Sequence, residues 1–324
     1  MTSLRRLGTS DLHVFPLALG GNVFGWSADE AQSFAVLDAY AAAGGNFVDT
    51  ADVYSAWAEG NRGGESETVI GRWLASRGNR SDILVATKVG AHPDFKGLSA
   101  ATIKAAAEES LRRLGTDHID LYYTHFDDES VPVEEIVTAL DQLVKEGKVR
   151  AVAASNISPE RLRASLDFAE AEGLARYVAL QPHYNLVSRE TYEGPLLDVA
   201  RQGGLAAVPY YGLASGFLTG KYRPGKVVDS VRAPRAAALA ETERGQRVLA
   251  ALDAVAEARG AEPATVALAW LASRPTVAAP IASARTVEQL PALVAVADLE
   301  LTEAELATLT EASEASEASE ASEA

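Results

Sequence analysis

Eight short apolar runs recur along the chain, and this recurrence constrains the fold more tightly than any other feature of the sequence. The runs lie near residues 16, 46, 83, 119, 149, 177, 205 and 277, and segments with helical spacing of apolar residues, such as 102–115 and 133–148, separate them. Strands that alternate with helices pair in parallel, and eight such units predict a (β/α)8 TIM barrel of the α/β class. A doubly wound sheet is the alternative, but no G-x-G-x-x-G motif opens a helix after the first run.

Segments outside these units refine the predicted barrel. Residues 4–15 predict an N-terminal β-hairpin that turns between Gly8 and Asp11. Three long connections, 52–67, 126–132 and 212–241, are expected at the C-terminal face of the barrel. Loops of this length in a compact domain are usually functional, so we expect the active site there.

Length and composition allow one α/β barrel or two smaller domains. A chain of 324 residues with 48% hydrophobic residues can form one barrel, which we place at residues 1–311. The net charge of −16 comes largely from the end of the chain, because ten acids and no Lys or Arg follow Thr286, leaving 35 acids and 29 bases elsewhere. Residues 312–324 continue an EAS repeat and predict an exposed acidic low-complexity tail, with an interaction tail as the alternative. We expect removal of residues 311–324 to change neither activity nor melting temperature.

The composition also excludes several classes of protein. There is no cysteine, which excludes disulfides, thiolate catalysis and Cys-ligated metals, and we expect no metal site. No basic stripe indicates nucleic-acid binding. The N-terminus has no apolar leader and no run reaches the roughly 18 apolar residues that span a bilayer, which predicts a cytoplasmic protein without a membrane partner. The oligomeric state is left undefined.

Polar residues close most of the predicted strands. Because the active site of such a barrel lies at the carboxyl ends of its strands, these residues should meet at one face. In chain order they are Asp49, Lys88, His125, Ser155, Asn156, Gln181 and Tyr210.

Four residues at this face predict a site for proton delivery. A buried lysine such as Lys88 needs a counter-charge, which Asp49 on the neighbouring strand can provide. The phenol of Tyr54 has an ordinary pKa of about 10, and a nearby ammonium should lower that pKa toward a useful range. His125 can then orient a carbonyl oxygen between itself and the phenol.

Seven stretches, in this order, carry a resemblance to a known family: NFVDTADVYS, GESETVIGRWL, VATKVG, SLRRLGTDHIDLYYTH, SNIS, QPHYN and GFLTGKY. With them the chain resembles an aldo-keto reductase up to about residue 311. The resemblance implies that Tyr54 is the proton donor, that Lys88 and Asp49 support it, and that His125 positions the substrate carbonyl. It also implies NADP(H) as the cofactor.

The resemblance further implies a set of cofactor contacts. Ser155, Asn156 and Gln181 match residues that hold the nicotinamide carboxamide, and Tyr210 matches the aromatic ring on which the nicotinamide stacks. Further contacts with the cofactor, including the loop over its pyrophosphate and the segment at its adenosine end, would come from Gly21, Asn22, Leu213, Gly216, Leu218, Gly220, Lys221, Ser283, Arg285 and Gln289.

The chain departs from the family pattern at three places. Tyr211 and Gly212 stand where the family usually has serine and proline, and Leu293 stands where it commonly has an adenine-binding asparagine. The usual lysine near the 2′-phosphate is absent, so Arg285, with Ser283 and Gln289, is the candidate for that phosphate.

The leading function is therefore transfer of a hydride from NADPH to an aldehyde or ketone, a small-molecule substrate, with the proton supplied by Tyr54. One alternative is a barrel aldolase in which Lys88 forms a Schiff base. Another is a regulatory subunit that senses redox state through bound cofactor. Trp26, Trp57 and Phe126 follow strand ends and are the candidate substrate pocket, but they do not identify the substrate.

Overall fold

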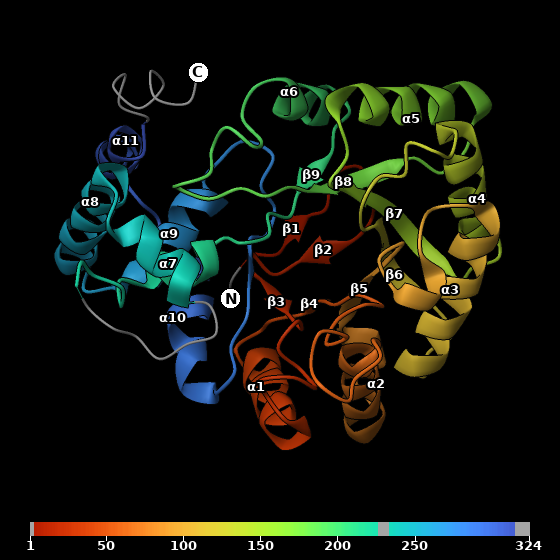
Figure 1. The fold of residues 1–324 in the computed structure, drawn as a ribbon, viewed down its shortest axis with the longest axis horizontal. Coiled ribbons are helices and arrows are strands. Elements are labelled where there is room, and N and C mark those ends of the chain that lie inside the picture. The colour runs from red at the N-terminus through yellow and green to blue at the C-terminus, as the bar shows by residue number, and fades with distance from the viewer. Residues whose placement is uncertain (1–2, 226–232, 315–324) are drawn as a thin grey trace.

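The computed structural model describes residues 3–225 and 233–314, and its centre is a ring of eight parallel strands (Figure 1). Each strand falls in one of the eight apolar runs. They are β3 (Ala18–Gly20), β4 (Phe47–Asp49), β5 (Leu84–Val89), β6 (Ile119–Thr124), β7 (Val149–Ser155), β8 (Tyr177–Gln181), β9 (Ala206–Ala207) and β10 (Ile281–Ala282).

The sheet order confirms the predicted barrel. Neighbouring strands follow one another from β3 to β9, and β10 pairs with β3. The last edge is closed because the N–H of Ala207 donates to the carbonyl of Thr276, and the N–H of Ala278 donates to the carbonyl of Ala207. The predicted N-terminal hairpin is present as β1 (Arg5–Arg6) and β2 (His13–Val14), which pair antiparallel. Its residues Leu7 and Leu12 are buried in the same apolar cluster as the inward-facing strand residues.

Helices surround the barrel, as the spacing of apolar residues predicted (Figure 1). Ser99 caps α3 by accepting a hydrogen bond from the N–H of Thr102, and Gly115 ends that helix in the left-handed region at φ 62°. The helices are α1 (Glu30–Ala42), α2 (Glu65–Arg77), α3 (Ala100–Leu114), α4 (Val133–Lys145), α5 (Pro159–Glu172), α6 (Pro195–Gln202), α7 (Ala233–Ala240), α8 (Glu243–Arg259), α9 (Pro263–Ala272), α10 (Leu290–Val294) and α11 (Glu303–Ala312). No helix among the described residues is long and apolar enough to cross a membrane.

The alternation of side chains along the strands decides which polar groups enter the barrel. On β5, Val85 packs outward among the helices and Ala86 packs inside the barrel. Lys88 lies two residues after Ala86, and Asp49 lies two residues after the inward-facing Phe47. Since successive side chains point to opposite faces, both polar groups project inward at the carboxyl ends of their strands.

The C-terminal end of the described chain packs against its neighbours. Ser313, directly after α11, is fully buried. Its hydroxyl accepts a hydrogen bond from Arg189 at 3.0 Å, and its carbonyl accepts one from Arg244 at 2.6 Å. These contacts argue against the expectation that removing residues 311–324 is silent, because Ser313 lies beyond the predicted boundary at 311 and would be lost. The rest of the predicted tail, 315–324, lies outside the described residues.

Candidate active site

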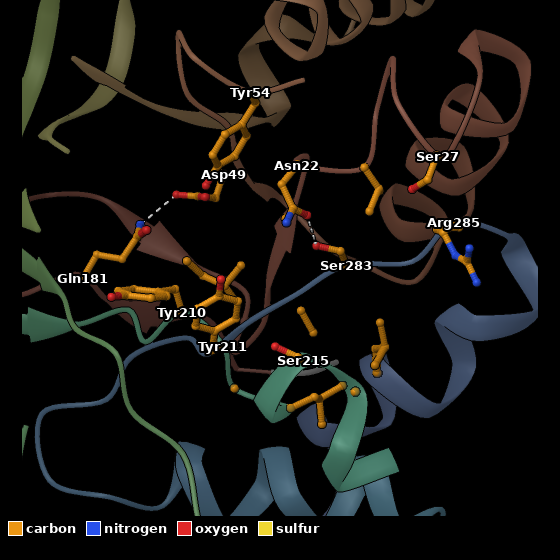
Figure 2. Close-up of a pocket in the computed structure, with 18 of the residues that line it drawn as sticks. Asn22, Ser27, Asp49, Tyr54, Gln181, Tyr210, Tyr211, Ser215, Ser283 and Arg285 are labelled. Atoms are coloured by element: carbon orange, nitrogen blue, oxygen red, sulfur yellow. Dashed lines mark hydrogen bonds between the residues drawn. The ribbon is translucent and has the colours of Figure 1, made fainter. Parts of the chain in front are cut away.

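Lys88 is the centre of the polar cluster at the barrel mouth. Its side chain has no exposed surface, and its ammonium donates to Asp49 Oδ2 at 2.7 Å, to the carbonyl of Thr50 at 2.7 Å and to Tyr54 Oη at 3.0 Å. Gln181, from β8, donates to the other oxygen of Asp49 at 2.8 Å (Figure 2). The expected pairing of Lys88 with Asp49 is therefore present, and each group is fixed by several hydrogen bonds.

The electrostatics of this cluster differ from the sequence expectation in one respect. Burial acts to lower the pKa of Lys88, but the Asp49 carboxylate and the Tyr54 phenol outweigh it and raise that pKa, so the lysine is an ammonium. Burial raises the pKa of Tyr54, and the opposing effect of Lys88 does not cancel it. The prediction of a lowered phenol pKa is thus wrong, because enclosure of the ring outweighs the nearby charge.

His125 follows β6 and lies beside the phenol. The imidazole and the Tyr54 ring are 6.0 Å apart between centroids, in an edge-on arrangement. Burial, followed by the charge of Lys88, lowers the pKa of His125 to about 3, so the ring is neutral near pH 7. Its Nδ1 is buried and has no hydrogen-bond partner among the described residues. A neutral imidazole can donate one hydrogen bond to a carbonyl oxygen without adding a positive charge beside Lys88.

The residues expected at the nicotinamide form a second hydrogen-bond network. Ser155 Oγ donates to the carbonyl of Gln181 at 2.8 Å. Tyr210 Oη donates to Asn156 Oδ1 at 2.8 Å, while Asn156 Nδ2 donates to the carbonyl of His125 at 2.8 Å. Asn156 has a positive φ of 47°, a region that asparagine tolerates better than most residues. This network ties the carboxyl ends of β6, β7 and β8 together beside Tyr54.

A cavity of about 820 Å³ joins these groups to the segments that follow β9 and β10. Most of the predicted site residues line it: Asn22, Trp26, Asp49, Tyr54, Trp57, His125, Phe126, Ser155, Asn156, Gln181, Tyr210, Leu213, Gly216, Lys221, Ser283, Arg285 and Gln289. Four predicted residues do not. Lys88 lies behind Asp49 and Tyr54, Leu218 is buried in the apolar core, and Gly21 and Gly220 are not among the lining residues.

The far end of the cavity carries the groups expected at the adenosine phosphate (Figure 2). Ser283 donates to Asn22 Oδ1 at 2.8 Å, and the N–H of Arg285 donates to Gln289 Oε1 at 2.9 Å. The guanidinium of Arg285 is exposed and has no ion pair with any described residue. Glu288 accepts hydrogen bonds from its own N–H and from the Thr286 side chain, which hold its pKa below the ordinary value.

Aromatic rings surround the reactive end of the cavity. The rings of Trp26 and Trp57 lie 5.5 Å apart, the rings of Trp57 and Tyr54 lie 6.0 Å apart, and Phe126 stacks on His125 at 4.8 Å. The three residues predicted for the substrate pocket therefore lie together with the proton-donating groups. No group of three or more metal-ligating side chains was found among the described residues.

Two residues near the site were given no role by the sequence reasoning. Tyr211 lines the cavity at a positive φ of 55°, and its place directly after Tyr210, the aromatic residue expected at the end of the seventh apolar run, was the available signal. Asp52 is fully buried beneath the site, and neither carboxylate oxygen has a hydrogen-bond partner among the described residues. Burial, followed by the charge of Glu67, raises the pKa of Asp52 to about 8. Nothing in the local sequence indicates that isolation.

The chain is similar in sequence to several known proteins. The sequence model of the Aldo/keto reductase family matches residues 16–314. The "Uncharacterized oxidoreductase YrpG" of Bacillus subtilis is 36% identical over 293 residues, which cover 88% of this chain and 87% of that protein. "Protein tas" of Escherichia coli is 32% identical over 330 residues, with 93% and 95% covered. "Norsolorinic acid reductase stcV" of Emericella nidulans is 32% identical over 313 residues, with 91% and 77% covered.

Proposed function

The chain belongs to the aldo/keto reductase family, and from this premise we propose that it reduces an aldehyde or ketone with NADPH, using Tyr54 as the proton donor. The observation that carries the proposal is the buried Lys88 ammonium, 2.7 Å from Asp49 and 3.0 Å from the Tyr54 phenol, at the base of a large cavity. Homologues named as oxidoreductases and as a reductase support the reaction class.

The roles of the side chains follow from their charges. The reduced nicotinamide, when bound, supplies a hydride to the carbonyl carbon. Tyr54 is a neutral phenol at neutral pH and can give its proton to the carbonyl oxygen, while His125 orients that oxygen through an N–H. The ammonium of Lys88 stabilises the phenolate that remains, and Asp49 keeps Lys88 charged. The product is the corresponding alcohol.

The cavity has residues suited to hold the cofactor. The Tyr210 ring and the amides of Asn156 and Gln181 lie beside Tyr54, where the nicotinamide would be held. At the far end Arg285 offers a planar fork of donors, which suits a phosphate on the adenosine ribose. These features favour NADPH over NADH.

Replacing Tyr54 by phenylalanine tests the proposal directly. Tyr54→Phe should lower kcat by more than about a hundredfold, because only the proton donor is lost, and cofactor binding measured by fluorescence should stay near the wild-type value. Tyr211→Phe is the matched control, since it removes another phenol that lines the cavity and should preserve most of the activity.

Two outcomes would contradict this assignment. If Tyr54→Phe keeps a large share of turnover while chemistry is rate-limiting, Tyr54 is not the donor. If borohydride traps a carbonyl substrate covalently on Lys88, the Schiff-base aldolase replaces the reductase. The burial of Lys88 and its three hydrogen bonds argue against that second result.

A further inference from the structure

Exposed aromatic side chains are concentrated at the reactive end of the cavity. Among the described residues five large hydrophobic side chains are strongly exposed, and three of them line this cavity: Trp57 at 50%, Phe126 at 52% and Tyr211 at 42%. Exposed apolar surface that gathers at one place marks a binding site rather than a chance feature of the surface. The other two, Leu4 and Val287, do not line the cavity.

The rings form a continuous series around the reacting groups. From Trp57 to Tyr54, from Tyr54 to His125 and from His125 to Phe126 the centroid distances are 6.0, 6.0 and 4.8 Å. A carbonyl oxygen held between Tyr54 and His125 therefore has an exposed aromatic ring on either side. A flat ligand in this space can contact Trp57 on one side and Phe126 on the other, and a fused bicyclic system offers these rings more aromatic surface than a single six-membered ring does.

Tyr211 forms a further wall of this space. Its backbone has a positive φ of 55°, which is costly for a bulky residue, and its carbonyl is held by Asn185 Nδ2 at 3.0 Å and by the N–H of Ala214 at 2.7 Å. Asn185 is fully buried, so the strained conformation is fixed from below. Figure 2 shows Tyr211 across the cavity from Tyr54.

The positive charges that line the cavity are placed away from these rings. Its cationic lining residues, Lys221 and Arg285, come from the segments after β9 and β10, which the proposed function assigns to the cofactor. Lys88, the ammonium bonded to Tyr54, has no exposed surface and already forms an ion pair with Asp49. A carboxylate or phosphate on the substrate would meet exposed aromatic rings at this end, where no described residue that lines the cavity offers a free positive charge, and it would lose solvation without compensation.

We infer that the substrate, given the reductase function proposed above, is an uncharged, flat carbonyl compound with at least two fused aromatic rings. Trp57 and Phe126 are the specificity-determining residues that contact its two sides, and Tyr211 covers its face. Aromatic rings give such a ligand buried apolar area together with edge-to-face or offset-stacked contacts. Small aliphatic carbonyls and anionic carbonyls are reduced less efficiently.

The test compares three aldehydes with NADPH: 2-naphthaldehyde, its 6-carboxylate and propanal. Wild-type kcat/KM for 2-naphthaldehyde should exceed the value for each of the others by about tenfold or more. Trp57→Ala and Phe126→Ala should each lower kcat/KM for 2-naphthaldehyde by about tenfold, mainly through KM, and change the value for propanal less than about twofold. Trp57→Phe should recover part of the loss. Leu4→Ala, an exposed apolar residue outside the cavity, is the control and should match wild type.

The outcomes separate this inference from the proposed function. Equal efficiency with all three aldehydes, or ratios that Trp57→Ala and Phe126→Ala leave unchanged, would overturn the inference and leave the reductase intact. If no carbonyl compound is reduced, the proposed function fails, and binding of 2-naphthaldehyde, followed by tryptophan fluorescence, decides the inference instead. Binding that Phe126→Ala weakens supports it, and absence of binding by the wild type refutes it.

Discussion

The two ends of the cavity are built differently. At the reactive end Lys88 has no exposed surface and three hydrogen bonds, and Asp49 is held on both oxygens by Lys88 and Gln181. At the other end the guanidinium of Arg285 is exposed, and within residues 3–225 and 233–314 a hydrogen bond fixes its backbone N–H, to Gln289, but none fixes the side chain. The reactive groups are thus positioned by hydrogen bonds within the protein, whereas the far end offers a charge that a ligand can orient.

This difference follows from what each end has to do. A proton donor must be held close to its productive geometry, because small displacements of reacting groups cost large factors in rate. A phosphate can be held by a charged side chain that moves to meet it, at the cost of side-chain entropy. Substitutions at the reactive end should therefore affect both rate and stability, and substitutions at the far end should affect affinity alone.

The largest effect is expected for Lys88→Met. The change removes the ammonium that stabilises the phenolate of Tyr54, so kcat should fall by about a hundredfold or more. It also leaves Asp49 buried without its counter-charge, which should lower the free energy of unfolding by about 3 kcal/mol in denaturant titrations. Adding Asp49→Asn to Lys88→Met should restore much of the stability but none of the activity.

Arg285→Met is the matched change at the far end. It should leave the melting temperature at the wild-type value, because the guanidinium has no ion pair with any described residue. If Arg285→Met destabilises the protein as much as Lys88→Met does, the two charged side chains contribute equally to stability, and the proposed difference between the two ends of the cavity is wrong.

Arg285→Ala sharpens the comparison through affinity. The KM for NADPH should rise about tenfold, equivalent to about 1.4 kcal/mol of lost binding, while kcat and the KM for NADH barely change. Equal effects on both cofactors would remove Arg285 from the 2′-phosphate. A wild-type preference for NADH would contradict the cofactor proposal itself.

The sequence predicted the reactive end better than the far end, for a physical reason. Positions such as Asp49 and Lys88 are dictated by strand periodicity, because the inward-facing residue at the carboxyl end of a barrel strand must enter the site. Leu218 illustrates the limit: it lies in a matching loop motif, yet its side chain packs into the core. Loop backbones such as Ala214–Thr219, with Ser215 and Gly216 at positive φ, have no periodicity from which side-chain directions can be read.

Burial was the other quantity that the sequence could not give. The direction of the pKa shift of Tyr54 depends on how completely the ring is enclosed, and that is set by residues distant in the chain. The raised pKa of Asp52 has the same origin. The charge of Glu67, on α2, contributes to that shift, and Asp52 in turn raises the pKa of Tyr122 on β6. These residues come close to one another only in the folded barrel.

Asp52 differs from the other polar residues near the reactive end, because its carboxylate has no hydrogen-bond partner among the described residues. This difference should appear in the pH dependence of the protein's stability. The folded protein holds the Asp52 proton up to about pH 8, whereas the unfolded chain releases it near the ordinary pKa of 3.8. Stability from this group is therefore fully present below pH 3.8 and is lost as the pH rises toward about 8. The melting temperature of Asp52→Asn, relative to that of the wild type, should therefore rise as the pH increases from 5 to 8.

The control for that measurement is Asp94→Asn, because Asp94 is exposed. Its difference in melting temperature from wild type should be the same at pH 5 and pH 8. A constant difference for Asp52→Asn as well would show that Asp52 is ionised in the folded protein throughout this range, and the raised pKa would be wrong.

The smallest effect is expected at the C-terminus. There, as at the two ends of the cavity, removing a residue with hydrogen bonds should lower stability, and removing residues beyond it should not. Truncation after Glu314 removes only the remainder of a low-complexity repeat, and activity and melting temperature should stay within error of the full chain. Truncation after Thr310 also removes Ser313, which is fully buried and bonded to Arg189 and Arg244, and leaves both arginines without that partner. The melting temperature of this shorter chain should fall by a few degrees, since a lost buried hydrogen bond costs about 1 to 3 kcal/mol.

Ser313→Ala in the full chain separates the contribution of the hydroxyl from that of the backbone, because it removes the hydrogen bond to Arg189 and keeps the carbonyl that Arg244 contacts. Equal melting temperatures for the two truncations would mean that the hydrogen bonds of Ser313 contribute nothing to stability. The link between hydrogen bonding and stability, which the two ends of the cavity suggest, would then not hold at the C-terminus.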